Sequence, residues 1–84
     1  LKAVSDRYLR IAEQRLRPRS YVEVARHLQR HWHPLLTLPI HKVKRATVAA
    51  RLGEIAGEHG PFAANRARAS LSALFTWAMG EGLA

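Results

Sequence analysis

The sequence predicts a small all-α domain, a compact four-helix bundle-like arrangement in which residues 1–84 form a single domain. Three observations support this prediction. Apolar residues recur at three- and four-residue spacing in four segments, which proline and glycine separate. No segment alternates apolar and polar residues as a half-buried strand would. The hydrophobic content of 48% is typical of a chain that forms a core.

The first helix is predicted over about Lys2–Leu16. Residues at helical spacing define its buried face: Val4, Tyr8, Ile11 and Ala12. Pro18 ends this pattern, because proline inside a helix loses a backbone hydrogen bond and clashes with the preceding turn.

The second helix is predicted to begin at Ser20 and to end at Pro34. Ser20 and Glu23 have the spacing of a capping box, in which two side chains satisfy free amides at the helix start. The helix has an apolar stripe and an opposite polar face, namely Tyr21, Val24, Ala25, Leu28 and Trp32 against Glu23, Arg26, His27 and Arg30. Residues 35–40 include another proline and are expected to form an extended connection.

The last two helices are predicted over about Arg45–Ala56 and Ala63–Met79. Gly57 or Gly60 is expected to provide the left-handed exit from the third helix, and Pro61 prevents its continuation. Their inward faces comprise Val48, Leu52 and Ile55 in the third helix and Ala67, Leu71, Leu74, Phe75 and Ala78 in the fourth.

Net charge is the bulk property that bears most on function. Fourteen lysines and arginines against six acidic residues give a formal net charge of +8. Such an excess favours a polyanionic partner, with nucleic acid first and an anionic membrane surface second. Most of the cations are arginines, whose planar guanidinium suits both phosphates and guanine edges.

Neither catalysis nor a metal centre is predicted. The chain has no cysteine, no His-Glu-x-x-His motif and no phosphate-binding glycine loop, and its acidic residues are scattered. His27 and His31 are interpreted as solvated side chains rather than metal ligands. We therefore expect a non-catalytic domain without a cofactor. The apolar runs are too short for a transmembrane helix or a signal peptide, so no membrane association and a cytoplasmic location are expected.

Cations gather at the predicted helix starts. A helix N-terminus already carries positive potential, so an exposed cation there costs about 0.3–1 kcal/mol. Free amides at the same position bind phosphate. Both points favour a DNA backbone as the source of negative charge that would offset these cations. Asn65 could bind either phosphate or adenine. The candidate DNA-binding residues are Arg19, Ser20, Lys42, Lys44, Arg45, Asn65, Arg66, Arg68 and Ser72.

Several short strings occur in a characteristic order over nearly the whole chain. They are Arg17-Pro18-Arg19-Ser20, His33-Pro34-Leu35-Leu36 with Leu38-Pro39-Ile40, Gly60-Pro61-Phe62-Ala63-Ala64-Asn65-Arg66, and Ser70-Leu71-Ser72-Ala73-Leu74-Phe75-Thr76-Trp77-Ala78 followed by Gly82-Leu83. Together they resemble the core-binding domain of phage-integrase-type tyrosine recombinases, the SAM-like N-terminal domain of that family.

The resemblance implies a domain that closes over one face of double-stranded DNA at a recombination site, while a C-terminal catalytic domain of the same protein closes over the other. The nucleophilic tyrosine would belong to that second domain, and neither Tyr8 nor Tyr21 matches it. Contact with other recombinase protomers and a bacterial, phage or mobile-element origin are also implied. Ala63 and Lys44 stand where the family often has capping residues, which predicts that the last two helices fray at their starts without DNA.

Two alternatives remain open. A helix-turn-helix regulator would use the last two helices, although the connection Glu58–Phe62 is long for the usual turn of three or four residues. A helical protein-interaction module would dock through Phe62, Trp77 and Met79, but it leaves the net charge of +8 unexplained.

Overall fold

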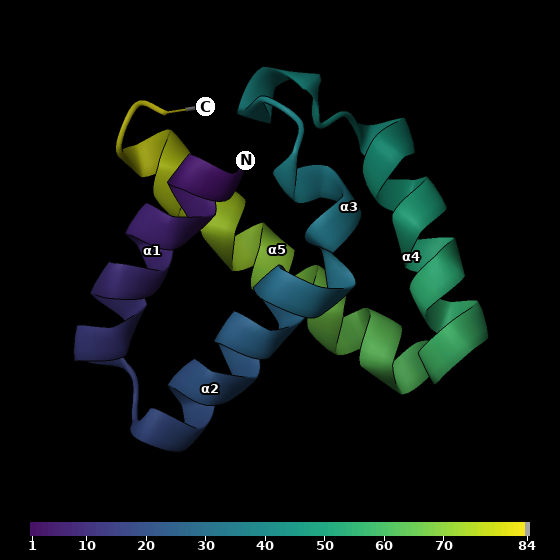
Figure 1. The fold of residues 1–84 in the computed structure, drawn as a ribbon, viewed down its shortest axis with the longest axis horizontal. Coiled ribbons are helices and arrows are strands. Elements are labelled where there is room, and N and C mark those ends of the chain that lie inside the picture. Colours follow the sequence, from purple (N-terminus) through teal and green to yellow (C-terminus); the bar gives the residue numbers. More distant parts are fainter. Residues whose placement is uncertain (84) are drawn as a thin grey trace.

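The computed structural model describes residues 1–83, and all regular structure within them is helical (Figure 1). The prediction of a small all-α domain is therefore confirmed. Among these residues, no helix combines the length and the apolar character needed to cross a membrane. The elements are α1 (Lys2–Arg15), α2 (Pro18–Arg26), the π-helical η1 (His27–His31), α3 (His33–Leu36), the 3-10 turn η2 (Ile40–Lys42), α4 (Arg45–His59) and α5 (Pro61–Gly80).

Helix α5 is the element on which the others converge. It packs against α4, η1 and α1, and it forms a V with α4 (Figure 1). Trp32, at the end of η1, is fully buried, and its indole N–H donates to the backbone oxygen of Ala67 at 2.8 Å. This bond ties η1 to α5 across the core. The core comprises Leu1, Leu9, Leu28, Trp32, Leu35, Ile55, Ala67, Leu71 and Leu74.

Two prolines begin helices as well as ending the preceding pattern. Helix α2 starts at Pro18 rather than Ser20, and α5 starts at Pro61 rather than Ala63. Proline suits the first helical position because its φ is already helical and its missing N–H has no partner to lose there. Ser20 therefore lies inside α2, and the predicted capping box with Glu23 does not form. Ala63 is no cap position either, so it gives no reason for α5 to fray.

Residues 33–36 form the short helix α3, which corrects the prediction of an extended connection. The π-helix η1 leads into it, and the N–H of Trp32 donates to the oxygen of His27 at 3.2 Å, one residue further back than in an α-helix. Arg51 from α4 donates through Nε to the oxygen of His31 at 2.6 Å. This contact satisfies a carbonyl near the end of the irregular turn.

A single residue, Gly60, joins α4 to α5. Helix α4 runs through Gly57 as far as His59, and Gly60 then takes φ +90° and ψ 165°. The positive-φ exit is therefore at Gly60 and not at Gly57. A one-residue connection is shorter than the three- or four-residue turn of a helix-turn-helix unit, so the expectation of a long connection is wrong.

Candidate nucleic-acid interface

All nine candidate DNA-binding residues are solvent-exposed, as contact with a polyanion requires. Two of them, Asn65 and Ser72, lie on the exposed face of α5. Together with Ala69 and Thr76 they recur every three or four residues, opposite the buried side of the helix. Three of these four side chains are small, so this face allows a close approach to the helix.

A groove between α4 and α5, which we call the α4 groove, brings four candidates together: Lys44, Arg45, Arg68 and Ser72. It has a volume of about 620 Å³, and Val43 and apolar residues of both helices form the rest of its lining. Lys44 is the N-cap of α4 and Arg45 its first residue. None of the described residues that line the groove is acidic. Three cations therefore share one concave surface without a neutralising partner in its lining.

The start of α4 is only weakly capped. The Lys44 side chain has no acceptor to offer a free amide, and the hydroxyl of Thr47 accepts the Lys44 backbone N–H at 3.4 Å. The fraying predicted from Lys44 thus keeps its physical basis, in contrast to the fraying predicted from Ala63.

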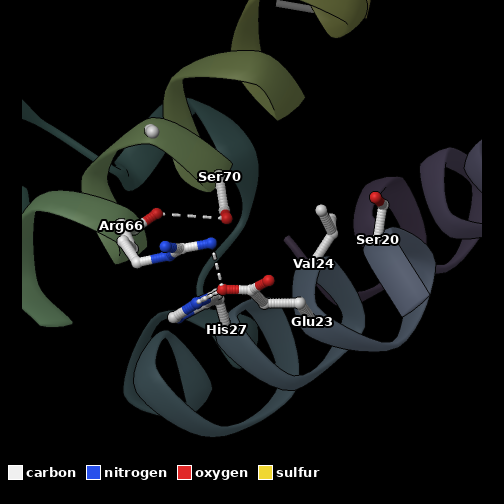
Figure 2. A pocket seen from close by; sticks show the side chains of 7 residues that line it. Ser20, Glu23, Val24, His27, Arg66 and Ser70 are labelled. Carbon is white, nitrogen blue, oxygen red and sulfur yellow. Dashed lines mark hydrogen bonds and ion pairs between the residues drawn. The ribbon is translucent and has the colours of Figure 1, made fainter. Parts of the chain in front are cut away.

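A second groove, of about 350 Å³, lies between α2 and α5 and contains Ser20 and Arg66 (Figure 2). Here Arg66 points across the groove at Glu23, with 2.5 Å between Nη2 and Oε1. The Arg66 guanidinium also lies 5.4 Å from the ring centroid of Phe62. Because Glu23 offsets its charge, Arg66 attracts a polyanion less strongly than the cations of the α4 groove do.

The two grooves flank one continuous surface. Arg66 and Arg68 project from different sides of α5, because two residues correspond to about 200° of rotation. The exposed face of α5 lies between these two directions. The N-terminal ends of α2 and α4 lie on opposite sides of α5 (Figure 1). The candidates on α5 and in the two grooves therefore form a band across α5, which we call the cationic band, rather than patches on unconnected sides.

Arg19 and Lys42 are exposed but line neither groove. Arg19 is the second residue of α2, next to Ser20, and Lys42 ends η2, two residues before Lys44. Both residues thus extend the cationic band at its edges without contributing to its concave surfaces.

The sequence interpretation missed a basic cleft that adjoins Arg66. His27, expected to be solvated, is only 4% exposed. Its ring stacks on His31 at 5.2 Å, and His31 meets His59 edge-on at 5.0 Å. Burial, with a smaller contribution from Arg26, lowers the pKa of His27, and burial followed by His27 lowers the pKa of His31. Both shifts favour the neutral form of the imidazoles.

No group of three or more histidines, cysteines, aspartates or glutamates in residues 1–83 could hold a metal ion. The residues considered for protein docking do not form one patch. Phe62 and Met79 are 72% and 60% exposed, but they lie near opposite ends of α5, about 26 Å apart at 1.5 Å per residue. Trp77 is half-buried and packs against Tyr8, with 5.6 Å between ring centroids.

The chain matches no protein-family model and no curated protein, and no solved structure matches it. Fold and surface together define a class, a small basic all-α domain with an exposed cationic band. Any more specific function rests on charge, exposure and geometry together with the sequence resemblance described above.

Proposed function

We propose that this chain is a duplex-DNA-binding domain, the core-binding domain of a phage-type tyrosine recombinase that holds the enzyme on its crossover site. The observation that carries the proposal is the cationic band, and above all the α4 groove with three cations and no acidic residue in its described lining. In this proposal the cleavage chemistry belongs to a C-terminal catalytic domain, and further recombinase protomers bind the same DNA.

The α4 groove supplies the main phosphate contacts in this proposal. Lys44 and Arg45 place charge beside the free amides at the start of α4, and Arg68 faces them from α5. Asn65 and Ser72 add hydrogen-bonding groups on the exposed face of α5. Phosphate contacts fix the register of a protein on DNA without reading its sequence, so we expect weak sequence specificity from this domain alone.

The salt dependence of binding to a fluorescently labelled duplex, followed by anisotropy, tests the proposal. If about five phosphates are neutralised, log K should fall with log salt at a slope of about −4 to −5. The double variant Lys44→Gln/Arg45→Gln should make this slope shallower by about 2. Arg10→Gln/Arg15→Gln removes the same charge from exposed positions of α1 and should leave the slope nearly unchanged. A parent slope near zero, or an equal loss in both variants, would contradict DNA binding through the band.

The recombinase assignment has its own test. The coding sequence that follows residue 84 in the parent gene is expected to encode the spaced Arg, His and Tyr residues of a tyrosine-recombinase catalytic domain. A reading frame without them would refute the assignment to recombinases and would leave duplex binding to be judged by the salt experiment.

A further inference from the structure

A second basic concavity, which we call the histidine cleft, lies between the α2–η1 segment and the corner where α4 meets α5. It has a volume of about 650 Å³. Four arginines, three histidines and two glutamates line it, so its charged residues give a surplus of two positive charges even with every imidazole neutral. Lys44 and Arg45, the main cations of the α4 groove, do not line this cleft. The histidine cleft is therefore distinct from the α4 groove, although it shares Arg66 with the second groove of the cationic band.

Three imidazoles of the cleft contact one another in the order His27, His31, His59, and we call them the histidine stack. His27 stacks on His31, and His31 meets His59 edge-on. His27 is 4% exposed, and neither of its ring nitrogens has a hydrogen-bond partner among the described residues. The Glu23 carboxylate lies 3.8 Å from His27 Nε2, too far for a hydrogen bond. A buried polar group without a partner costs about 1–3 kcal/mol. A ligand or proton that supplies the missing partner would recover part of that free energy.

Two of the four arginines are available to a ligand. Arg51 is held by the oxygen of His31 and by Glu54, and Arg66 is held by Glu23. Arg26 and Arg30 are exposed, and no described carboxylate lies within 4.0 Å of either. Two free guanidiniums at the mouth of a cleft with a buried, unpartnered imidazole are complementary to a compact anion with several oxygens.

We propose that the histidine cleft binds the phosphoryl group of a phosphorylated ligand, a compact dianion, and that a proton from solvent is taken up by the histidine stack on binding. The free guanidiniums of Arg26 and Arg30 pair with the phosphoryl oxygens. The new negative charge favours the imidazolium form, which donates from both ring nitrogens. The remaining charged groups around the stack are Glu23 of α2, Arg51 and Glu58 of α4, and Arg66 of α5.

Sulfate is the probe for this site, because it stays a dianion throughout the pH range in which imidazoles titrate. It is added at constant ionic strength against chloride, and the histidine ring resonances are followed by NMR. We expect saturable shifts of the His31 and His59 resonances. Affinity should rise by about tenfold per pH unit for each proton taken up as the pH falls through the histidine range. Unshifted resonances, or an affinity that ignores pH, would overturn the proposal.

Matched variants separate the cleft from the overall positive charge. Arg26→Gln/Arg30→Gln should abolish saturable sulfate binding, whereas Lys44→Gln/Arg45→Gln, with the same net charge, should retain it. An equal loss in both variants would show only general attraction and would refute the site. Because the second pair tests duplex binding, loss of sulfate binding and loss of DNA binding are distinguishable results. Circular dichroism of each variant confirms that the helices remain folded.

Competition identifies the source of the phosphoryl group. A duplex with a 5′-phosphate that displaces sulfate, where the same duplex with a 5′-hydroxyl does not, would assign the cleft to a DNA end. Displacement by inorganic phosphate but by neither duplex would assign it to a small phosphorylated ligand. Failure of inorganic phosphate to displace sulfate would contradict a phosphoryl site.

Discussion

Replacement of Trp32 by phenylalanine removes a buried hydrogen bond and part of a fully buried ring system. The indole N–H donates to the Ala67 oxygen at 2.8 Å, and the side chain has no exposed surface. The Ala67 carbonyl retains its bond within α5, so the loss of the indole bond costs about 0.5–1.5 kcal/mol. The two missing ring carbons add about 0.8 kcal/mol each. We therefore expect the free energy of unfolding to fall by about 2–3 kcal/mol.

Thermal unfolding followed by circular dichroism measures this loss. For a domain of this size the Tm should fall by about 10–20 °C, at 4–8 °C for each kcal/mol. Trp77→Phe is the matched control, because Trp77 is half-buried and its indole makes no hydrogen bond to another described residue. It should cost less than about 1 kcal/mol. Equal Tm values for the two variants would refute the role assigned to the bond between η1 and α5.

Three further predictions follow from the same structure. Gly60→Ala should destabilise the domain by about 1–3 kcal/mol, because a φ of +90° with an extended ψ is nearly exclusive to glycine. Gly57→Ala should instead stabilise the domain by about 0.5–1 kcal/mol, because Gly57 lies inside α4 with open space around it. Urea midpoints with changes of the same sign would contradict this pair. Folding lowers the pKa of His27 and His31, so as the pH falls the unfolded chain binds protons before the folded domain does. We therefore expect full stability above about pH 6.5, where the neutral imidazoles predominate, and lower stability as the pH drops below it. Urea unfolding in sulfate-free buffers measures the effect, and higher stability in acid would contradict it. Glu23→Gln frees Arg66, the arginine that Glu23 neutralises, so the salt slope of duplex binding should steepen by about 1. An unchanged slope would show that Arg66 does not belong to the DNA-binding surface.

Helical periodicity was sufficient to predict the inward faces of α4 and α5, because each of these helices buries a stripe of apolar residues that repeats at helical spacing. The prolines show where local patterns are insufficient. Pro18 and Pro61 each follow one helix closely and occupy the first position of the next. Proline has a fixed φ and no N–H, and these properties suit both the end of one helix and the start of the next. The local sequence is therefore compatible with either role.

His27 shows the limit of treating one helix at a time. The pattern of α2 places it with Arg26 and Arg30 on a polar face, and those two arginines are indeed exposed. His27 lies at the edge of that face, where α5 covers it with Arg66 and Ser70. Which flank a second helix covers depends on how the two helices pack. The histidine cleft could not be predicted for the same reason. Nor could the sequence show that cations distant along the chain lie together in the α4 groove.

The central position of α5 has a consequence for recognition. Since α1, η1 and α4 all rest on it, α5 cannot open without disrupting most of the core, and its amides should be among the last to exchange with deuterium. A polyanion that docks on its outer side therefore meets a backbone that is already ordered. The entropic cost of association then falls mainly on the long side chains of arginine and lysine.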